Sequence, residues 1–199
     1  SMSAISTLTS SRNVVTAVNR ITKELSIGAR KITVSTVGIV PNIRKLTHDK
    51  GVPPVRLAVS LHCADDKERS ALLPVNGRYG GLAELFAALR EYIDVTGRRI
   101  TFEWALIAGE NDDVKSARSL GELIVRKYQL RKDLVHVNVI PLNPTGKYEG
   151  RPSRRDDVDR FCSTLMDEFG ISCTPRVRRG IDIDAGCGQL KAAVLKQQD

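Results

Sequence analysis

The sequence predicts an α/β fold in which parallel strands alternate with helices. Two observations support this prediction. Short apolar segments of strand length alternate with segments whose apolar residues recur at helical spacing, and only a few residues connect one segment to the next. Such βα units build a parallel sheet, either open or closed into a barrel. The 199 residues suit one domain with a sizeable core, and no second domain or short repeat is visible.

The first half of the chain predicts two helices and two strands. Asn13 can cap a helix that ends at Gly28 and whose apolar face consists of Val14, Val15, Val18, Ile21 and Leu25. Residues 31–36 (KITVST) predict a strand, and a short helix follows around Ile43 and Leu46. Beyond a loop with two prolines, the nearly all-apolar segment 55–62 predicts a strand covered on both faces.

The second half continues the alternation. Residues 82–95 predict a helix with one apolar side, formed by Leu82, Leu85, Phe86, Leu89 and Ile93. A strand over 100–106 follows, and Asn111, Asp112 and Asp113 can begin a helix that runs to about Tyr128. Residues 135–140 predict the next strand, about 155–169 a further helix, and 171–177 a last strand.

The composition favours a polyanionic partner. Thirty-one Lys and Arg residues against 23 Asp and Glu residues give a net charge of +8. Nucleic acid is the default partner for such a chain, because basic side chains that neutralise phosphates supply most of the sequence-independent affinity. A merely basic, soluble surface is the alternative. No apolar run approaches the roughly 18 residues that a membrane span requires, so we expect no membrane partner.

The cysteines and the N-terminus carry little chemistry by themselves. Cys63, Cys162, Cys173 and Cys187 form no CxxC or CxxxCxxC cluster, so no metal site is predicted in this chain. No secretory signal is visible, and we therefore expect reduced thiols. Ser1-Met2 resembles a scar left by tag removal. We expect residues 1–12 to be this scar and a flexible lead, and residues 13–199 to form the domain.

Polar residues follow several predicted strands. Ligand sites of parallel sheets lie beyond the carboxyl ends of the strands, where this sequence has Ser35, Ser60 with His62, the 109–113 loop and Asn143. A shared ligand pocket would need such hydrogen-bonding residues. Taken singly, each has a structural alternative: the serines can cap helices, His62 can be a structural histidine, and Asn143 can form a turn. Glu103, in mid-strand, needs a partner or a function unless it faces water.

Cys187 stands between two glycines, shortly after the basic residues Arg176, Arg178 and Arg179. Glycine has no Cβ, so Gly186 and Gly188 allow a large ligand to approach the sulfur closely. A reactive thiol needs such access. The alternative is a small, inert, buried cysteine at a tight turn.

Five segments together resemble one family. They are STVGIVP (35–41), LAVSLH (57–62), LLPVN (72–76), NVIPLNP (138–144) and GIDIDAGCGQL (180–190). In this order they are similar to segments of the RlmN/Cfr radical-SAM methyltransferases of large-subunit ribosomal RNA, and the resemblance extends from about Asn13 onward. It implies an incomplete, TIM-like radical-SAM barrel with its first strands absent.

The resemblance implies a role for each matched residue. Ser35, Ser60, Leu61, His62 and Asn143 would contact S-adenosylmethionine (SAM), and Cys187 would accept a methyl group and become S-methylcysteine. A second SAM, cleaved at a [4Fe–4S] cluster, would then generate the radical that transfers this carbon to an adenine of ribosomal RNA, with transfer RNA as a further candidate substrate. The residues Arg176, Arg178 and Arg179 suit RNA phosphates.

Several parts of the family pattern are missing. The sequence lacks the CxxxCxxC motif that holds the cluster, the upstream glycine-glutamate SAM segment, the N-terminal RNA-binding domain and the second, resolving cysteine. We therefore expect an enzyme fragment that is inactive by itself, from a cytoplasmic protein or one of an organelle matrix or stroma. An exposed sheet edge at the cut predicts homo-oligomers.

Two other hypotheses remain. The chain could be a non-catalytic RNA-binding α/β module that lost its cluster domain in nature. It could also be an unrelated phosphate-binding barrel, although it has no glycine-rich phosphate loop.

Overall fold

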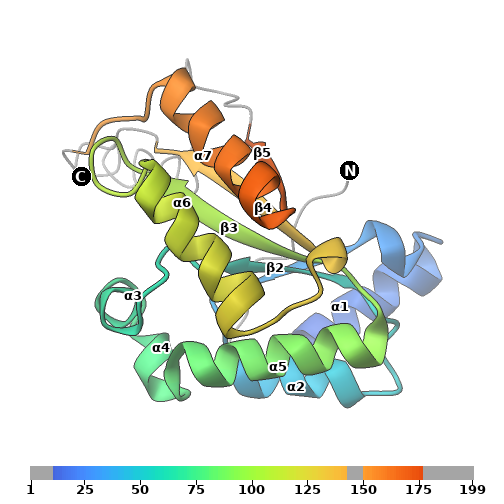
Figure 1. The fold of residues 1–199 in the computed structure, drawn as a ribbon. Coiled ribbons are helices and arrows are strands. Elements are labelled where there is room, and N and C mark those ends of the chain that lie inside the picture. Colours follow the sequence, from blue (N-terminus) through green and yellow to red (C-terminus); the bar gives the residue numbers. More distant parts are fainter. Residues whose placement is uncertain (1–10, 143–149, 177–199) are drawn as a thin grey trace, which may run out of the picture.

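A computed structural model describes residues 11–142 and 150–176 (Figure 1). Within them the chain forms one five-stranded sheet with helices packed against it. The strands are β1 (Thr33–Thr36), β2 (Arg56–Ser60), β3 (Ile100–Leu106), β4 (Val135–Pro141) and β5 (Ser172–Pro175). The α/β class predicted from the sequence is confirmed.

All neighbouring strands are parallel, and their order in the sheet, β1-β2-β3-β4-β5, is their order in the chain. A doubly wound sheet reverses direction at a switch point, whereas here every connection advances the same way. Because such connections are right-handed, they place their helices on one face of the sheet. The sheet is open and has the strand order of a TIM-like barrel segment, as predicted.

The predicted helices are present close to their expected bounds. They are α1 (Ser11–Glu24), α2 (Val40–His48), α5 (Gly81–Thr96), α6 (Val114–Gly121) and α7 (Arg155–Phe169). The helix expected to reach about Tyr128 continues beyond α6 as a π-helical segment, Glu122–Lys127. Short 3₁₀ turns, Ala29–Lys31 and Lys132–Leu134, precede β1 and β4.

Two short helices between β2 and α5 were not predicted. These are α3 (Asp66–Leu72) and α4 (Val75–Arg78). The sequence of α3, DKERSAL, is mostly polar and therefore has no apolar period that would predict a helix. Its cap is nevertheless visible in the sequence: the Asp65 carboxylate accepts hydrogen bonds from the backbone amides of Lys67 and Glu68, at 2.8 and 3.0 Å.

The core lies between the helices and one face of the sheet. Along β3 the buried residues Ile100, Phe102, Trp104 and Leu106 alternate with half-buried ones, and β4 alternates in the same way. Phe86 of α5 stacks on Phe102, with 5.5 Å between the ring centroids, and on Tyr128, at 4.4 Å. The expectation of a strand covered on both faces holds for β2, where Leu57, Ala58 and Val59 are all buried.

The strand expected over 55–62 ends earlier, at Ser60. His62 has a backbone φ of +60°, which lies in the left-handed region and cannot continue a strand. The chain therefore turns at the carboxyl end of β2, and this turn forms part of the candidate site.

Candidate functional site

Polar side chains line the sheet face that carries no connecting helices. The register pairs Ser35 of β1 with Ala58 of β2, and Ser60 of β2 with Glu103 of β3. Because parallel neighbours in register point to the same side and residues two apart share a face, Ser35, Ser60 and Glu103 lie on one face. Asn138 of β4 continues this row beside Glu103.

Glu103 has the partner that its mid-strand position requires. The Asn138 side-chain amide donates a hydrogen bond to its carboxylate, at 2.8 Å. Burial raises the pKa of Glu103, while this hydrogen bond and the positive charge of Arg176 act in the opposite direction. Arg176 follows β5, and its backbone N–H donates to the Val139 carbonyl at 2.7 Å. The structure thus brings Arg176 to the same polar face.

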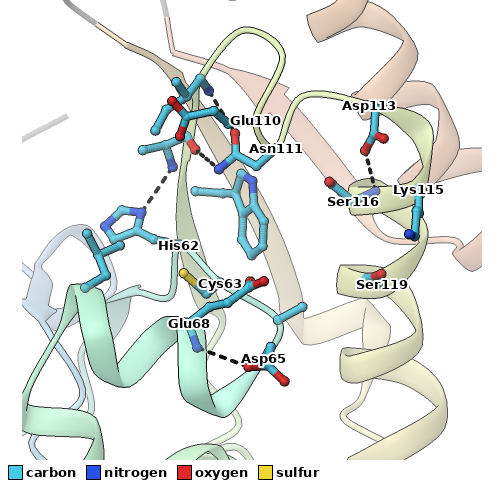
Figure 2. A pocket seen from close by; sticks show the side chains of 15 residues that line it. His62, Cys63, Asp65, Glu68, Glu110, Asn111, Asp113, Lys115, Ser116 and Ser119 are labelled. Carbon is cyan, nitrogen blue, oxygen red and sulfur yellow. Dashed lines mark hydrogen bonds between the residues drawn. The ribbon is translucent and has the colours of Figure 1, made fainter. Parts of the chain in front are cut away.

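The Ser60-Leu61-His62 segment presents its three residues differently. Ser60 is half-buried on the polar face, whereas the Leu61 side chain is fully buried in the core. The backbone groups of Leu61 are also occupied, because its N–H donates to the Glu103 carbonyl at 3.1 Å and its carbonyl accepts from the Cys63 N–H at 2.8 Å and from Arg69 at 3.2 Å. The ring of His62 turns toward β3, where its Nδ1 accepts a hydrogen bond from the Ala105 backbone N–H, at 3.1 Å (Figure 2).

This hydrogen bond fixes the tautomer of His62. Since Nδ1 accepts, the neutral ring carries its proton on Nε2 and can donate there. Burial, reinforced by the charge of Arg69, lowers the pKa of His62 to about 4. His62 is therefore a neutral N–H donor at physiological pH.

The helix-capping alternative for the two serines is wrong. The residue that caps α2 is Ile39, and Asp65 caps α3. Thr36, next to Ser35, accepts the turn hydrogen bond from the Gly38 backbone N–H through its Oγ1, at 3.1 Å. Ser35 and Ser60 thus do not serve as helix caps.

A cavity of about 660 Å³ opens beside this turn, between α3 and the N-terminal half of α6 (Figure 2). His62 and Cys63 line one side, together with Asp65 and Glu68 of the α3 region. The opposite side is formed from the α6 region by Asp113, Lys115, Ser116 and Ser119. Asp65 and Asp113 are both occupied as helix caps, Asp113 accepting from the Ser116 amide at 2.7 Å. These two carboxylates of the rim therefore have a structural role.

A second groove, of about 730 Å³, lies where α6 and α7 begin. Its cationic side chains are Lys115, Arg151, Arg154 and Arg160. Arg160 forms an ion pair with Asp157 of the same groove. Asp112 and Asp113 also line the groove, so its four cations exceed its three carboxylates by one. Among the described residues, Lys115, Arg151 and Arg154 form no ion pair within 4.0 Å.

The predicted site extends beyond the described residues. Asn143, Arg178, Arg179 and Cys187 lie outside the described residues. Within 11–142 and 150–176 there is no group of three or more His, Cys, Asp or Glu side chains that could hold a metal ion. Cys63 is half-buried, and the buried pair Cys162 and Cys173 has its sulfurs 3.2 Å apart as free thiols. No helix in these ranges is long and apolar enough to cross a membrane.

Comparison with known proteins places the sequence in a family. The chain is 52% identical over 173 residues to the dual-specificity RNA methyltransferase RlmN 1 of Myxococcus xanthus, covering 87% of this chain and 45% of the relative. It is 51% identical over 169 residues to the probable RlmN 2 of Opitutus terrae, covering 85% and 37%. The chain belongs to the RlmN family. No protein-family model matches it.

A solved structure supports the same assignment of the RlmN-family chain. The chain resembles the crystal structure of a radical SAM methyltransferase from Sphaerobacter thermophilus, with a TM-score of 0.74 and 45% identity. That match covers 85% of this chain and 47% of the other. The chain spans less than half the length of these relatives.

Three groups that contact the Ser60-Leu61-His62 segment or support it were not among the predicted site residues of this RlmN-family chain: Arg69, Asn76 and the Ala105 backbone N–H. Arg69 lies in a helix that was not predicted, and its side chain is fully buried. Asn76 closes the LLPVN segment, so a signal for it was present in the sequence. The Ala105 amide had no signal, because its contact with His62 depends on the pairing of β2 with β3.

Proposed function

We propose that this chain is the C-terminal part of a radical-SAM methyltransferase that methylates an adenine of large-subunit ribosomal RNA and also acts on transfer RNA. One observation carries the proposal. Ser35 and Ser60, from two of the family-like segments, lie on one polar face of the sheet, and His62 lies at the carboxyl end of β2 beside that face. The relatives of this chain are named RNA methyltransferases. The same face also holds Glu103 and Arg176.

The described residues fit a SAM site. SAM combines an amino-acid group with a nucleoside, and it therefore needs several hydrogen-bonding groups close together. Ser60 supplies a hydroxyl group, and His62 supplies a neutral Nε2–H donor held by Ala105. In this proposal Leu61 acts by holding the turn between Ser60 and His62 in place, because its side chain is buried and its backbone N–H and carbonyl are both hydrogen-bonded. When bound, SAM supplies the methyl group and, at a reducing cluster, the adenosyl radical.

The described residues do not fit an iron–sulfur cluster. A cluster needs several thiolates gathered at one point. Here Cys162 and Cys173 are buried together away from Cys63, and no larger group of ligands is present in the described ranges. We therefore assign the [4Fe–4S] ligands to a segment upstream of this chain, and we expect the 199 residues alone to be inactive.

The remaining proposed roles rest on sequence. Asn143 completes the SAM contacts, Cys187 carries the methyl group, and Arg178 and Arg179 join Arg176 in binding RNA phosphates. The thiolate of Cys187 would attack the methyl carbon of SAM, so that a new carbon–sulfur bond forms while the bond from the methyl group to the sulfonium breaks and S-adenosylhomocysteine leaves.

Peptide mapping tests this proposal. The complete enzyme is expressed with SAM and purified anaerobically, and the Cys187 peptide is analysed by mass spectrometry. We expect one added methyl or methylene group on Cys187, absent from Cys187→Ala and unchanged in the matched variant Cys63→Ala. An unmodified Cys187 in an enzyme that cleaves SAM would refute the carrier role.

An RNA-binding module without catalysis is the second candidate function. The groove that holds Lys115, Arg151, Arg154 and Arg160 favours it, since these four cations outnumber the three carboxylates that line the same groove and can neutralise phosphates. In the Arg151→Ala, Arg154→Ala double variant we expect weaker RNA binding. The slope of log K for RNA against the logarithm of the salt concentration should become shallower, by the amount that about one to two phosphate contacts contribute. Such binding by a complete protein that has no methyltransferase activity would select this alternative.

Location and assembly follow from the proposed substrates and the open sheet. Because ribosomal and transfer RNA are the substrates, we propose a cytoplasmic enzyme, or an organellar one in a eukaryote. In the described residues β1 (Thr33–Thr36) pairs on one side only, with β2. An unpaired edge can add a strand from a second copy, so we propose that the 199-residue chain forms homo-oligomers. A monodisperse monomer by light scattering would contradict this.

A further inference from the structure

Arg69 is a fully buried arginine outside the set of predicted site residues. It lies on α3, and its side chain is 0% exposed. A guanidinium keeps its charge in proteins and has five N–H donors, so its burial is costly unless most donors find acceptors. The arrangement of those acceptors therefore indicates what the residue does.

Three backbone carbonyls accept from this guanidinium. Its Nη2 donates to the carbonyls of Val37 and Ser60, at 2.9 and 3.0 Å, and its Nε donates to the carbonyl of Leu61, at 3.2 Å. Among the described residues Arg69 forms no ion pair within 4.0 Å. The charge is thus directed at the main chain where β1 and β2 end.

The other side of the guanidinium is held by a polar network. Its Nη1 donates to the side-chain carbonyl of Asn76, whose amide group donates to the Asp66 carboxylate at 3.0 Å. The same carboxylate oxygen accepts from the Leu82 backbone N–H, at 2.7 Å. These contacts connect the start of α5 through α3 and α4 to the two strand ends.

The backbone around Arg69 leaves little freedom. Gly38 has a φ of +97°, and a Cβ there would lie 3.1 Å from Nη2 of Arg69. A side chain at this position would therefore disturb both the turn and the guanidinium. On the β2 side, the anchored carbonyls of Ser60 and Leu61 directly precede His62, which itself has a φ of +60°.

We propose that Arg69 is a positioning residue, which holds the ends of β1 and β2 so that Ser60 and His62 meet the cofactor in a preformed arrangement. The inference rests on the proposed SAM site. Preorganised groups bind more tightly because the complex loses less conformational freedom when it forms. Without Arg69, binding would have to order the turn between Ser60 and His62.

Two substitutions and one matched control test this role in the complete enzyme. Arg69→Met keeps the length of the side chain but removes all its donors, and Arg69→Lys keeps the charge with a different donor geometry. Tyr92→Phe is the control, since the Tyr92 hydroxyl donates a buried hydrogen bond to the Val55 carbonyl at the opposite end of β2, at 2.7 Å. It should lower stability without disturbing the site.

Two readouts are needed. SAM affinity is measured by calorimetry at a temperature where every variant is folded by circular dichroism. Hydrogen exchange is followed in peptides that cover 36–38 and 60–63. We expect Arg69→Met to bind SAM at least tenfold more weakly and to exchange faster in both peptides, with Arg69→Lys intermediate and Tyr92→Phe unchanged in both.

The outcomes separate this inference from the proposed function. If Arg69→Met binds SAM as tightly as Tyr92→Phe and its exchange in the two peptides is unchanged, the positioning role is wrong. If the unsubstituted enzyme does not bind SAM, the proposed function fails, whereas faster exchange in Arg69→Met alone would still establish that Arg69 orders the strand ends.

Discussion

The protonation of His62 should make the stability of this protein depend on pH between about 4 and 6.5. The pKa of His62 is about 4 in the folded chain, against 6.5 for an ordinary histidine. Between these values the unfolded chain binds a proton that the folded chain does not, so stability falls as the pH falls. The physical causes are burial first and the charge of Arg69 second. Protonation would also place a proton on Nδ1, so that this nitrogen could no longer accept the hydrogen bond from the Ala105 N–H.

The magnitude follows from linkage. With these two pKa values, the His62 contribution is complete above pH 7, is reduced by about 1 kcal/mol at pH 6, and by about 2 kcal/mol at pH 5. His62→Asn is a suitable reference, since asparagine tolerates the left-handed backbone and does not titrate. All other titrating groups are common to both proteins and cancel in the difference.

Urea unfolding of the two proteins at pH 7.5, 6 and 5 measures this effect. We expect the stability advantage of the unsubstituted chain over His62→Asn to shrink by about 2 kcal/mol from pH 7.5 to 5. Histidine NMR signals provide a direct check, because the chain has three histidines. The reasoning would be refuted if the free energies of unfolding of the two proteins changed equally with pH, or if the His62 signal titrated near pH 6.5.

Two further predictions concern packing and Glu103. A Cβ at Gly121 would lie 2.4 Å from the Phe169 ring, so Gly121→Ala should destabilise the chain by about 1–2 kcal/mol in urea unfolding, despite the better helix propensity of alanine. Gly77→Ala, with no atom within 4 Å of its Cβ, is the control, and equal stabilities would contradict the packing argument. Because burial raises the pKa of Glu103, the folded chain holds that proton to higher pH than the unfolded chain, and stability is lost as the pH rises through the folded value. Glu103→Gln, which can still accept from Asn138, should therefore have a higher Tm than the unsubstituted chain at pH 7.5, with a gap that narrows toward pH 4.5; a gap independent of pH would contradict this.

Local patterns were enough to predict the elements and the fold class. The helical spacing of Leu82, Leu85, Phe86, Leu89 and Ile93 predicted α5, and all five are buried. The alternation of helices with short apolar strands predicted a parallel sheet, because parallel strands need long connections. Local patterns failed for α3, whose polar sequence carries no apolar period. They also placed the end of β2 two residues too late, since the left-handed turn at His62 has no signal in sequence.

The candidate site divides in the same way. The sequence by itself determined which residues belong to family-like segments, including Ser35, Ser60, Leu61 and His62, because such segments are read directly from the chain. Only the tertiary structure decided how they act: the Leu61 side chain is buried, His62 donates through Nε2, and Asn138 satisfies Glu103. Each of these facts depends on which strand lies beside which and in what register. His62 and Ala105 are 43 positions apart in the sequence, and Glu103 and Asn138 are 35 apart, yet each pair forms a hydrogen bond. A local sequence pattern does not encode contacts over such separations.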